Sequence, residues 1–543
     1  MPSSKKPSLP FRIRRRLRLE RASLLNRWRL YRIAAQVARH APRSASGVTV
    51  AFFRPSSAIL GMNLNNTFHM LSAWALRLQG VRVVHFQCQA GMSRCVLGTD
   101  RDDPHAAPPC AACTRFSRRL YQRQEVQKFA YTQDSALAAA LQGLDLPALE
   151  QIEWGSLPLG KLVLPALRWV LRRHHLPDDE PTRFLLREYI LSAHSIAQEF
   201  SAFLDRVQPQ AVILFNGTFY PEAVARQVAI QRGIRAITHE VGLMANSAYF
   251  TDGEATAYPI HIPEDFELSP AQNARLDAYL QDRFQGNFSM AGIRFWPEMR
   301  RLDEAFLAQA AQFRQIVPVF TNVIFDTSQV HANTVFPHMF AWLDLVLEIA
   351  AAHPDTFFVV RAHPDESRPG KESRESVQQW AEQRGVASLP NLRFVPPGEY
   401  ISSYELIQRA HFVMIYNSSI GLEATLLGAP VLCAAKARYT AYPTVFFPQS
   451  IPAFRAQAET FLGEGQIVVP AEFQRNARRF LYYQLFRTSL PLGEYYGPAP
   501  MPGFVILRPF GVQALTPEHS PSLGVILNGI LHGQPFLLED DPR

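Results

Sequence analysis

The sequences Arg361-Ala-His-Pro-Asp-Glu366 and Asn417-Ser-Ser-Ile-Gly-Leu-Glu423 each follow a short apolar run, Phe357–Val360 and Phe412–Tyr416 respectively. Short runs of β-branched and aromatic residues predict buried strands. Each polar sequence therefore lies where a strand ends, and the second leads directly into a helical pattern. In open α/β sheets, ligands bind at the carboxyl ends of the strands. The two sequences thus predict a ligand site in the second half of the chain.

The residue types in these loops suit a phosphate group. Ser418, Ser419 and Gly421 would present hydroxyls and backbone N–H groups at the N-terminus of a helix, where anions bind. Arg361 and His363 would add positive charge from the end of the neighbouring strand. We therefore predict a pocket for the phosphates of a nucleotide.

Strands and helices alternate in two series along the chain. Such alternation predicts parallel sheets covered by helices, and a polar, helical stretch at 252–310 separates the two series. The predicted fold class is therefore α/β, with two Rossmann-like, doubly wound domains that face each other across a cleft. The predicted parts are a basic arm at 1–45, a first domain at 46–310 with a cysteine-containing loop and a helical insertion, a nucleotide-binding second domain at 311–470, and a crossover helix with a tail at 471–543.

The positive charge of the chain is concentrated at its start. Residues 1–45 hold thirteen Lys or Arg and one acid, Glu20, whereas the whole chain of 543 residues has a net charge of +8. Leu17, Leu24, Trp28 and Tyr31 are interleaved among the arginines. This composition is typical of a helix on an anionic membrane surface, although a solvated basic tail has the same charge pattern. Because nucleic-acid enzymes usually carry their charge on the body of the fold, we expect no nucleic-acid partner.

Four of the five cysteines lie close together in the sequence, and the last two of these form a Cys-x-x-Cys. In a cytosolic chain such a cluster indicates a metal site before it indicates disulfides. Four thiolates would close a tetrahedral structural zinc site, while four ordinary reduced thiols are the alternative. The predicted ligands are Cys88, Cys95, Cys110 and Cys113.

Two motifs in the second half resemble those of a known family. Arg361-Ala-His-Pro364 resembles the His-Pro motif of bacterial sialyltransferases and of the Kdo transferases that build capsule polysaccharide. The segment from Asn417 to Glu423, with Gly428-Ala-Pro430 after it, resembles the serine motif and helix of the capsule polysaccharide biosynthesis family. The overlap runs from about 315 to 445. The resemblance implies a GT-B glycosyltransferase with the nucleotide on its second domain.

The resemblance also assigns roles within the second domain. It implies that His363 contacts the phosphate of the leaving nucleotide and that the serine loop holds the same phosphate. It suggests that Glu423 accepts hydrogen bonds from ribose hydroxyls, and an acid favoured by the helix dipole is the alternative. Pro364 would fix the turn that directs the imidazole into the cleft. The expected nucleotide-binding residues, besides the catalytic His363, are Arg361, Pro364, Asn417, Ser418, Ser419, Gly421 and Glu423.

In the first domain, two predicted strands lead into polar residues, Asn216 after one and His239-Glu240 at the end of the other. The related transferases carry an acid here that acts as base toward the acceptor hydroxyl, and the resemblance gives this role to Glu240. A carboxylate that only pairs with a nearby cation is the alternative. Asn216 and His239 are expected to position substrate, as are Asn322 and Asp326 in the second domain. A helix cap is the alternative for Asp326.

These features predict an enzyme, a nucleotide-sugar-dependent glycosyltransferase. The resemblance favours a CMP-sugar such as Kdo or a sialic acid as donor and a surface polysaccharide or glycolipid as acceptor. No convincing Asp-x-Asp pair follows a strand, so we expect the transfer to need no metal at the phosphate. The alternatives are a CDP-polyol phosphotransferase, a nucleotide-sugar 2-epimerase with the same two-domain cleft, and a non-catalytic scaffold of capsule assembly.

The sequence contains no run of eighteen apolar residues, so we expect no transmembrane helix. The charged N-terminus has no apolar segment behind it, which argues against a signal peptide. The expected location is the cytoplasm, with the basic arm on the inner face of the cell membrane.

Overall fold

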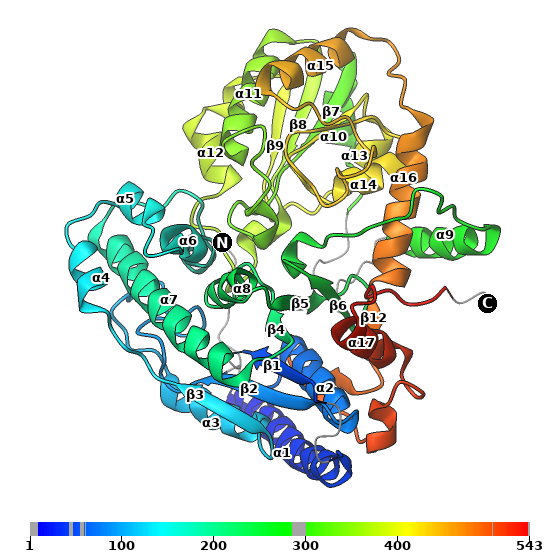
Figure 1. Ribbon diagram of the computed structural model, residues 1–543. Coiled ribbons are helices and arrows are strands. Elements are labelled where there is room, and N and C mark those ends of the chain that lie inside the picture. The colour runs from blue at the N-terminus through cyan, green and yellow to red at the C-terminus, as the bar shows by residue number, and fades with distance from the viewer. Residues whose placement is uncertain are drawn as a thin grey trace.

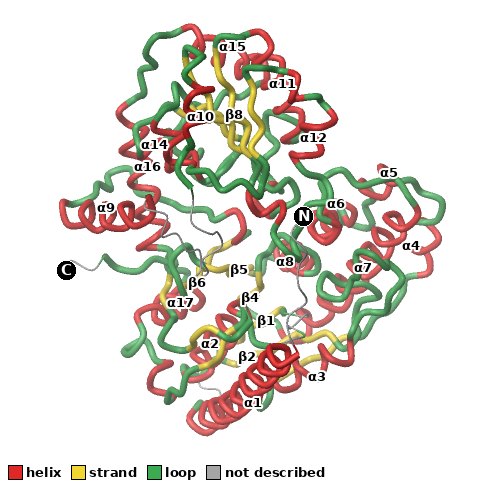
Figure 2. The backbone as a smooth tube through the Cα atoms, turned by 180° about the vertical axis from the view of Figure 1, so that it is seen from behind, coloured by secondary structure: helices red, strands yellow, loops and turns green. Residues whose placement is uncertain are grey.

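The computed structural model describes residues 9–42, 47–54, 59, 61–284, 300–501 and 503–540. The chain forms two large β-sheets, each covered by helices, and the second lies above the first in Figure 1. Figure 2 shows the same two parts from behind. Residues 1–8 and 43–45 of the predicted basic arm lie outside the described residues.

The first sheet has seven strands in the order β12-β6-β5-β4-β1-β2-β3. Strands β3, β2, β1, β4 and β5 are parallel, and β6 and β12 extend one edge with antiparallel pairs. The strands are β1 (Thr49–Phe53), β2 (Arg82–Cys88), β3 (Glu125–Phe129), β4 (Ala211–Phe215), β5 (Arg235–Val241), β6 (Ser247–Asp252) and β12 (Leu490–Pro491).

The second sheet has five parallel strands in the order β11-β10-β7-β8-β9. Counted within its own series, each sheet therefore runs 3-2-1-4-5, which is the Rossmann order. The two sheets confirm the predicted α/β class and its two Rossmann-like domains, the GT-B architecture. The strands are β7 (Gln315–Phe320), β8 (Thr356–Arg361), β9 (Leu392–Val395), β10 (Val413–Ile415) and β11 (Val431–Cys433).

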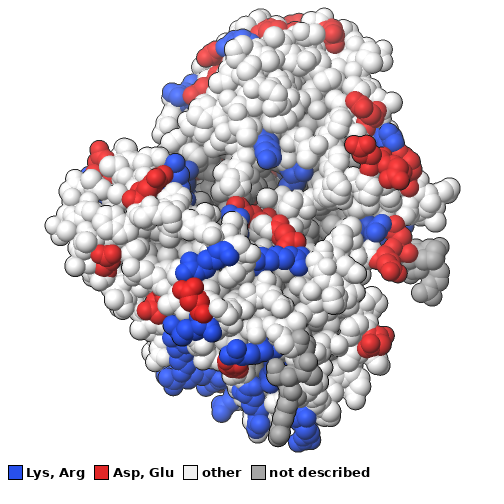
Figure 3. Space-filling model, in the orientation of Figure 1, with Lys and Arg blue, Asp and Glu red and all other residues white. Residues whose placement is uncertain are grey.

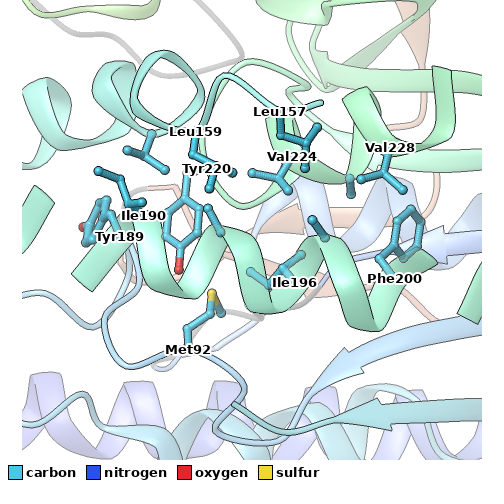
Figure 4. Close-up of a cluster of buried hydrophobic side chains, with 14 of the residues drawn as sticks. Met92, Leu157, Leu159, Tyr189, Ile190, Ile196, Phe200, Tyr220, Val224 and Val228 are labelled. Carbon is cyan, nitrogen blue, oxygen red and sulfur yellow. The ribbon is translucent and has the colours of Figure 1, made fainter. Parts of the chain in front are cut away.

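Helices bury both faces of each sheet. The longest helix of the first domain's insertion, α7 (Glu180–Val207), begins after Asp179, whose carboxylate accepts the backbone N–H of Thr182 at 2.9 Å. Its apolar face joins α8 and the strand side chains in one core. Figure 4 shows the part of this core in which side chains of α7 and α8 face each other. The remaining helices before the second sheet are α1 (Leu9–His40), α2 (Leu64–Leu78), α3 (Cys110–Leu120), α4 (Ser135–Ala140), α5 (Leu146–Gln151), α6 (Leu159–Leu171), α8 (Glu222–Gln231), α9 (Pro270–Phe284) and α10 (Glu304–Ala310).

The helices of the second domain follow its strands in the predicted alternation. Trp342 and Leu343 of α11 and Phe454 of α15 are buried with the strand side chains in one core. The helices are α11 (Met339–Ala352), α12 (Val377–Gln383), α13 (Ser403–Gln408), α14 (Ile420–Leu426) and α15 (Ile451–Gly463).

The end of the chain returns to the first domain. Helix α16 (Ala471–Tyr482) leads through a π-helical turn to β12, which pairs with β6 of the first sheet. The hairpin of β13 (Tyr496–Pro498) and β14 (Val505–Leu507) and helix α17 (Pro521–His532) then pack into the core around α2. Buried side chains of the described residues after 487 are thus part of the first domain's hydrophobic core.

The predicted strands at Phe357–Val360 and Phe412–Tyr416 fall on β8 and β10. Strand β3 lies in the part of the first domain for which only a cysteine-containing loop and a helical insertion were predicted. Its sequence Glu-Val-Gln-Lys-Phe carries charges, and β3 pairs only with β2 at the edge of the sheet. An edge strand is partly solvated and tolerates such residues.

Among the described residues, no helix is both long and apolar enough to cross a membrane.

Candidate active site

Both sheets present polar residues at their topological switch points. In the Rossmann order, the crevice for ligands opens where the strand order reverses, between β1 and β4 in the first sheet and between β7 and β10 in the second. Arg54 and Asn216 follow the first pair of strands, and Asn322 and Asn417 follow the second. Figure 3 shows a hollow between the domains in which blue and red side chains gather.

Contacts between the domains close one side of this cleft. His331 Nε2, from the second domain, lies 2.7 Å from the carboxylate of Glu254, which follows β6. The hydroxyl of Tyr442 accepts the backbone N–H of Ile262 at 2.8 Å and donates to the carbonyl of Ile260 at 2.9 Å. These bonds join the connection after β6 to the second domain.

Glu240 lies near the end of β5, on the cleft side of the first domain, and is partly buried. Burial raises its pKa to about 7, although the N–H of Val241, the amide of Asn65 and the charges of Arg54 and Arg438 favour the ionised form. A carboxylate with a pKa near neutrality can take up a proton from a sugar hydroxyl. The position and pKa of Glu240 fit the role of general base that the sequence suggested.

The charge of Arg438, a residue of the second domain, acts on Glu240. The guanidinium carbon of Arg438 lies 3.9 Å from the centre of the Tyr258 ring, and the hydroxyl of Tyr258 donates to the carbonyl of Val241 at 2.6 Å. Arg438 and Tyr258 thus form one wall beside the carboxylate. Sequence reasoning did not find Tyr258, which lies in no recognisable motif.

His363 follows β8 and is oriented by its own turn. Its Nδ1 accepts the backbone N–H of Asp365 at 3.2 Å, so in the neutral ring the proton is on Nε2. Burial lowers the pKa of His363, while the charges of Asp365 and Asp326 oppose that shift. The neutral imidazole is therefore a hydrogen-bond donor through Nε2, suited to a phosphate oxygen.

The serine loop after β10 is held by Tyr439, whose hydroxyl donates to the carbonyl of Ser418 at 2.6 Å. Ser418 is 9% exposed, and Ser419, the N-cap residue of α14, is exposed and makes no side-chain cap hydrogen bond. The hydroxyl of Ser419 is thus not used in capping its own helix. The backbone of Gly421 packs against Ile415 and Tyr439. A glycine is therefore needed here because a larger side chain has no room, and not because a ligand approaches the backbone.

We expect Gly421→Ala to lower the free energy of unfolding by about 1–3 kcal/mol, the cost of overpacking a filled core. A Cβ at this position would lie 2.3 Å from Cδ1 of Ile415 and 2.5 Å from the hydroxyl oxygen of Tyr439. Urea unfolding measures the loss. Gly463→Ala at the end of α15 is the matched control, because a Cβ there meets nothing within 4 Å. Equal stability of the two variants would contradict the packing role.

Asn322 and Asn417 bind each other instead of projecting separately into the cleft. The N–H of Asn417 donates to Oδ1 of Asn322 at 3.3 Å, and its side-chain amide donates to the carbonyl of Ser328 at 2.9 Å. Gln329 donates to Oδ1 of Asn417 at 2.9 Å. Both predicted ligand-binding asparagines therefore use these groups to position the loops on either side of the switch point.

Glu423 differs from its predicted role. Its Oε1 accepts from Arg283 at 2.5 Å and its Oε2 accepts from the hydroxyl of Tyr404 at 2.6 Å, in a pair whose side chains are 9% and 7% exposed. Both carboxylate oxygens are engaged within the protein, so the structure assigns Glu423 to a buried ion pair and not to ribose. Nothing in the sequence links Arg283 to Glu423, because they are far apart in the chain.

Arg361 is also engaged within the fold. It is 6% exposed and donates to the hydroxyl of Ser403 at the start of α13, and burial lowers its pKa to about 10. Pro364 begins the short helix that follows His363 and is partly exposed. Only one guanidinium nitrogen makes this contact, because Nε and Nη2 of Arg361 are buried without a hydrogen-bond partner in the described part of the chain. The role of Arg361 at the phosphate stays a prediction.

His239 and Asn216 are structural in the first domain. His239 is fully buried on the opposite side of β5 from Glu240, where its Nε2 lies 3.4 Å from Nδ1 of His69. Adjacent strand residues point to opposite faces, which explains why His239 misses the cleft. Asn216 adopts a left-handed conformation with φ 66°, and its Oδ1 accepts the N–H groups of Thr218 and Phe219.

Asp326 is exposed and makes no side-chain hydrogen bond to the turn that follows it. Its negative charge opposes the lowering of the pKa of His363 by burial and acts on the guanidinium of Arg172 and on Lys371. The structure therefore places Asp326 in the cleft beside His363 and does not support the helix-cap alternative. Arg54, Arg172 and Lys371 were missed, although Arg54 directly follows an apolar strand and the strand-end rule would have found it.

The four clustered cysteines converge from β2, the next loop and α3. Each is partly buried and reduced, and burial, together with the neighbouring thiols, raises the pKa of Cys88 to about 12. Among the described residues, no group of three or more His, Cys, Asp or Glu side chains has the arrangement of a metal site. Zinc at Cys88, Cys95, Cys110 and Cys113 stays a prediction.

The fold and the site together define a class: a protein of GT-B architecture with a strand-end acid on one domain and a histidine and serine loop on the other. The motif region also matches a family model. Residues 289–445 match the family described as "Capsule polysaccharide biosynthesis protein", which confirms the resemblance read from the motifs. The chain therefore has the GT-B architecture, and its residues 289–445 resemble the capsule polysaccharide biosynthesis family.

Comparison with solved structures gives distant similarities. The KpsC β-Kdo 2,4-transferase of Thermosulfurimonas dismutans is 10% identical, with a TM-score of 0.34, over 56% of this chain and 87% of that chain. The β-Kdo 2,7-transferase of the same organism is 14% identical, with a TM-score of 0.33, over 59% and 87%. The UDP-GlcNAc 2-epimerase of Neisseria meningitidis, bound to UDP-GlcNAc, is 12% identical, with a TM-score of 0.23, over 80% and 98%. No curated protein matches the chain.

Proposed function

We propose that this protein is a glycosyltransferase of capsule polysaccharide biosynthesis that moves a sugar from a nucleotide donor to a growing polysaccharide or glycolipid. The observation that carries the proposal is the pairing of Glu240, with its pKa of about 7, and the Nε2-protonated His363 on the two sides of one interdomain cleft. The family match over the motif region supports the same activity.

In this proposal the donor phosphate lies between the turn of His363 and the serine loop. The Nε2–H of His363 and the hydroxyl of Ser419 donate to phosphate oxygens and stabilise the charge that grows as the bond from sugar to phosphate breaks. Glu240 accepts the proton of the acceptor hydroxyl as that oxygen attacks the anomeric carbon. Arg438 and Tyr258 bound the space beside the carboxylate and orient the acceptor.

A cytidine nucleotide is the donor group that we propose first. The motif region supports this choice, since the His-Pro and serine motifs resemble those of transferases that use CMP-sugars. A CDP-activated polyol donor would use the same phosphate contacts.

A binding screen of CMP, CDP, UDP and GDP by thermal unfolding tests the site. A ligand at about 100 times its dissociation constant stabilises a protein by about 2.7 kcal/mol, so a shift of the unfolding midpoint is readily measured. We expect CMP or CDP to stabilise the protein, and His363→Ala to weaken that binding by roughly 10–100-fold, the loss of a hydrogen bond to a charged group.

His353→Ala is the matched control for this screen. His353 lies before the N-terminal end of β8, whereas His363 follows its C-terminal end. The Nε2 of His353 pairs with Glu459 at 2.6 Å. The control should bind the nucleotide as the wild type does. Stabilisation by UDP alone would favour a UDP-sugar enzyme or an epimerase, and no response to any nucleotide would contradict the proposal.

A further inference from the structure

Helix α1 is anchored to the first domain by one of its faces. Leu30, Ile33 and Val37 are buried in the core beside α2. Asn26 donates to the carbonyl of Val505 at 2.7 Å and accepts the N–H of Leu507 at 2.8 Å, so it fixes the helix to β14. The predicted basic arm is therefore, over most of its length, a docked helix with a defined orientation.

The opposite face of α1 carries large apolar side chains that the fold leaves exposed. Leu17, Leu24, Trp28 and Tyr31 are 54%, 63%, 53% and 52% exposed. Their spacings of seven, four and three residues place them in one stripe along the helix, about 21 Å long at 1.5 Å per residue. We call these four residues the outer stripe of α1.

Arginines flank the outer stripe. Arg14, Arg18, Arg21, Arg27 and Arg32 are exposed on α1, whose one acid is Glu20. The neighbouring helix α3 carries no acid and adds three exposed arginines to the same region. Figure 3 shows blue side chains concentrated at the end of the molecule where α1 and α3 lie, although acidic side chains are also present there. The added arginines are Arg115, Arg118 and Arg119.

We infer that the outer stripe of α1, with the flanking arginines of α1 and α3, docks on an anionic lipid membrane. Apolar side chains of this size enter the boundary between headgroups and acyl chains, while arginines reach up to the lipid phosphates on their apolar stems. A nucleic acid would pair with the arginines but would leave four large apolar side chains in water. Lipid matches both parts of the surface.

Docking through α1 fixes how the enzyme stands on the membrane. In Figure 1, α1 lies at the end of the first domain that is far from the second sheet. The membrane surface would therefore lie beneath the first domain, and the second domain would project away from it. This inference does not rest on the proposed activity.

Co-sedimentation with vesicles tests the inference. We expect the full chain to bind vesicles that contain about 30% phosphatidylserine and not vesicles of phosphatidylcholine alone, with binding that weakens as salt rises. The triple variant Leu17→Ser, Leu24→Ser and Trp28→Ser should lower the partition coefficient by more than about tenfold. A second variant, Arg14→Gln, Arg18→Gln and Arg21→Gln, should lower it on anionic vesicles to a similar degree.

Ile230→Ser with Val468→Ser is the matched control, because these side chains are exposed apolar residues, at 48% and 83%, that lie outside α1. This control should bind vesicles as the wild type does. All variants should keep the wild-type unfolding midpoint and nucleotide response, which separates a failure here from a failure of the proposed function. Absence of binding to anionic vesicles, equal binding by the outer-stripe variant, or binding of nucleic acid without lipid would overturn the inference.

Discussion

Glu240→Gln should lower kcat for sugar transfer by about 10²–10⁴-fold, the usual contribution of a general base. Glutamine keeps the shape of the side chain and cannot accept the proton of the acceptor hydroxyl. Because the pKa of Glu240 is about 7, the wild-type rate should rise with pH through neutrality as the carboxylate ionises and should level off above it. A pH profile of kcat/KM on both proteins measures this, and the variant should lack the rise.

Glu222→Gln is the matched control for this base. Burial also raises the pKa of Glu222 to about 7, and Arg54 acts on both carboxyls. Glu222 is only 6% exposed, at the start of α8, so it is less accessible to an acceptor. Nucleotide binding should be unchanged in both variants. If Glu222→Gln lost as much rate as Glu240→Gln, the assignment of Glu240 as the general base would be wrong.

Glu423→Ala should lower the free energy of unfolding by about 3–5 kcal/mol, because it removes the carboxylate that balances the buried charge of Arg283. The pair is 2.5 Å apart and nearly inaccessible to water. Urea unfolding should show the loss in the transition of the second domain.

An exposed pair gives the comparison for Glu423. Arg82 and Glu125 are 2.6 Å apart, each 43% exposed, so Glu125→Ala should cost less than about 1 kcal/mol. The double variant Arg283→Met with Glu423→Leu should recover much of the stability, since an apolar pair removes both charges. Equal losses for Glu423→Ala and Glu125→Ala would show that burial of the first pair adds nothing.

The sequence predicted the positions of those candidate residues that follow strand ends. Several of these residues lie where apolar runs lead into loops: His363, Ser418, Ser419 and Asp326. Because the strands are parallel, their carboxyl ends bring those loops to the same end of the sheet. Glu240 was found the same way in the first domain. Such residues are predictable because the alternation of strands and helices fixes which ends share an edge.

The failures have a common cause in long-range packing. Glu423 was expected to bind ribose, but Arg283, which is remote in sequence, engages it. His239 was expected in the cleft, but the alternation along β5 turns it toward His69. Tyr258 was missed because its place beside Glu240 depends on the fold of the connection after β6. Local patterns do not show which buried partner will take a polar side chain.

The return of the chain to the first domain has a consequence for folding during synthesis. Strand β12 and helix α17 fill the edge and core of the first domain, yet they follow the whole second domain in the chain. The ribosome therefore releases the second domain's complete sequence before the first domain can bury its core. The second domain is positioned to mature first, while the earlier-made half waits for its last segment.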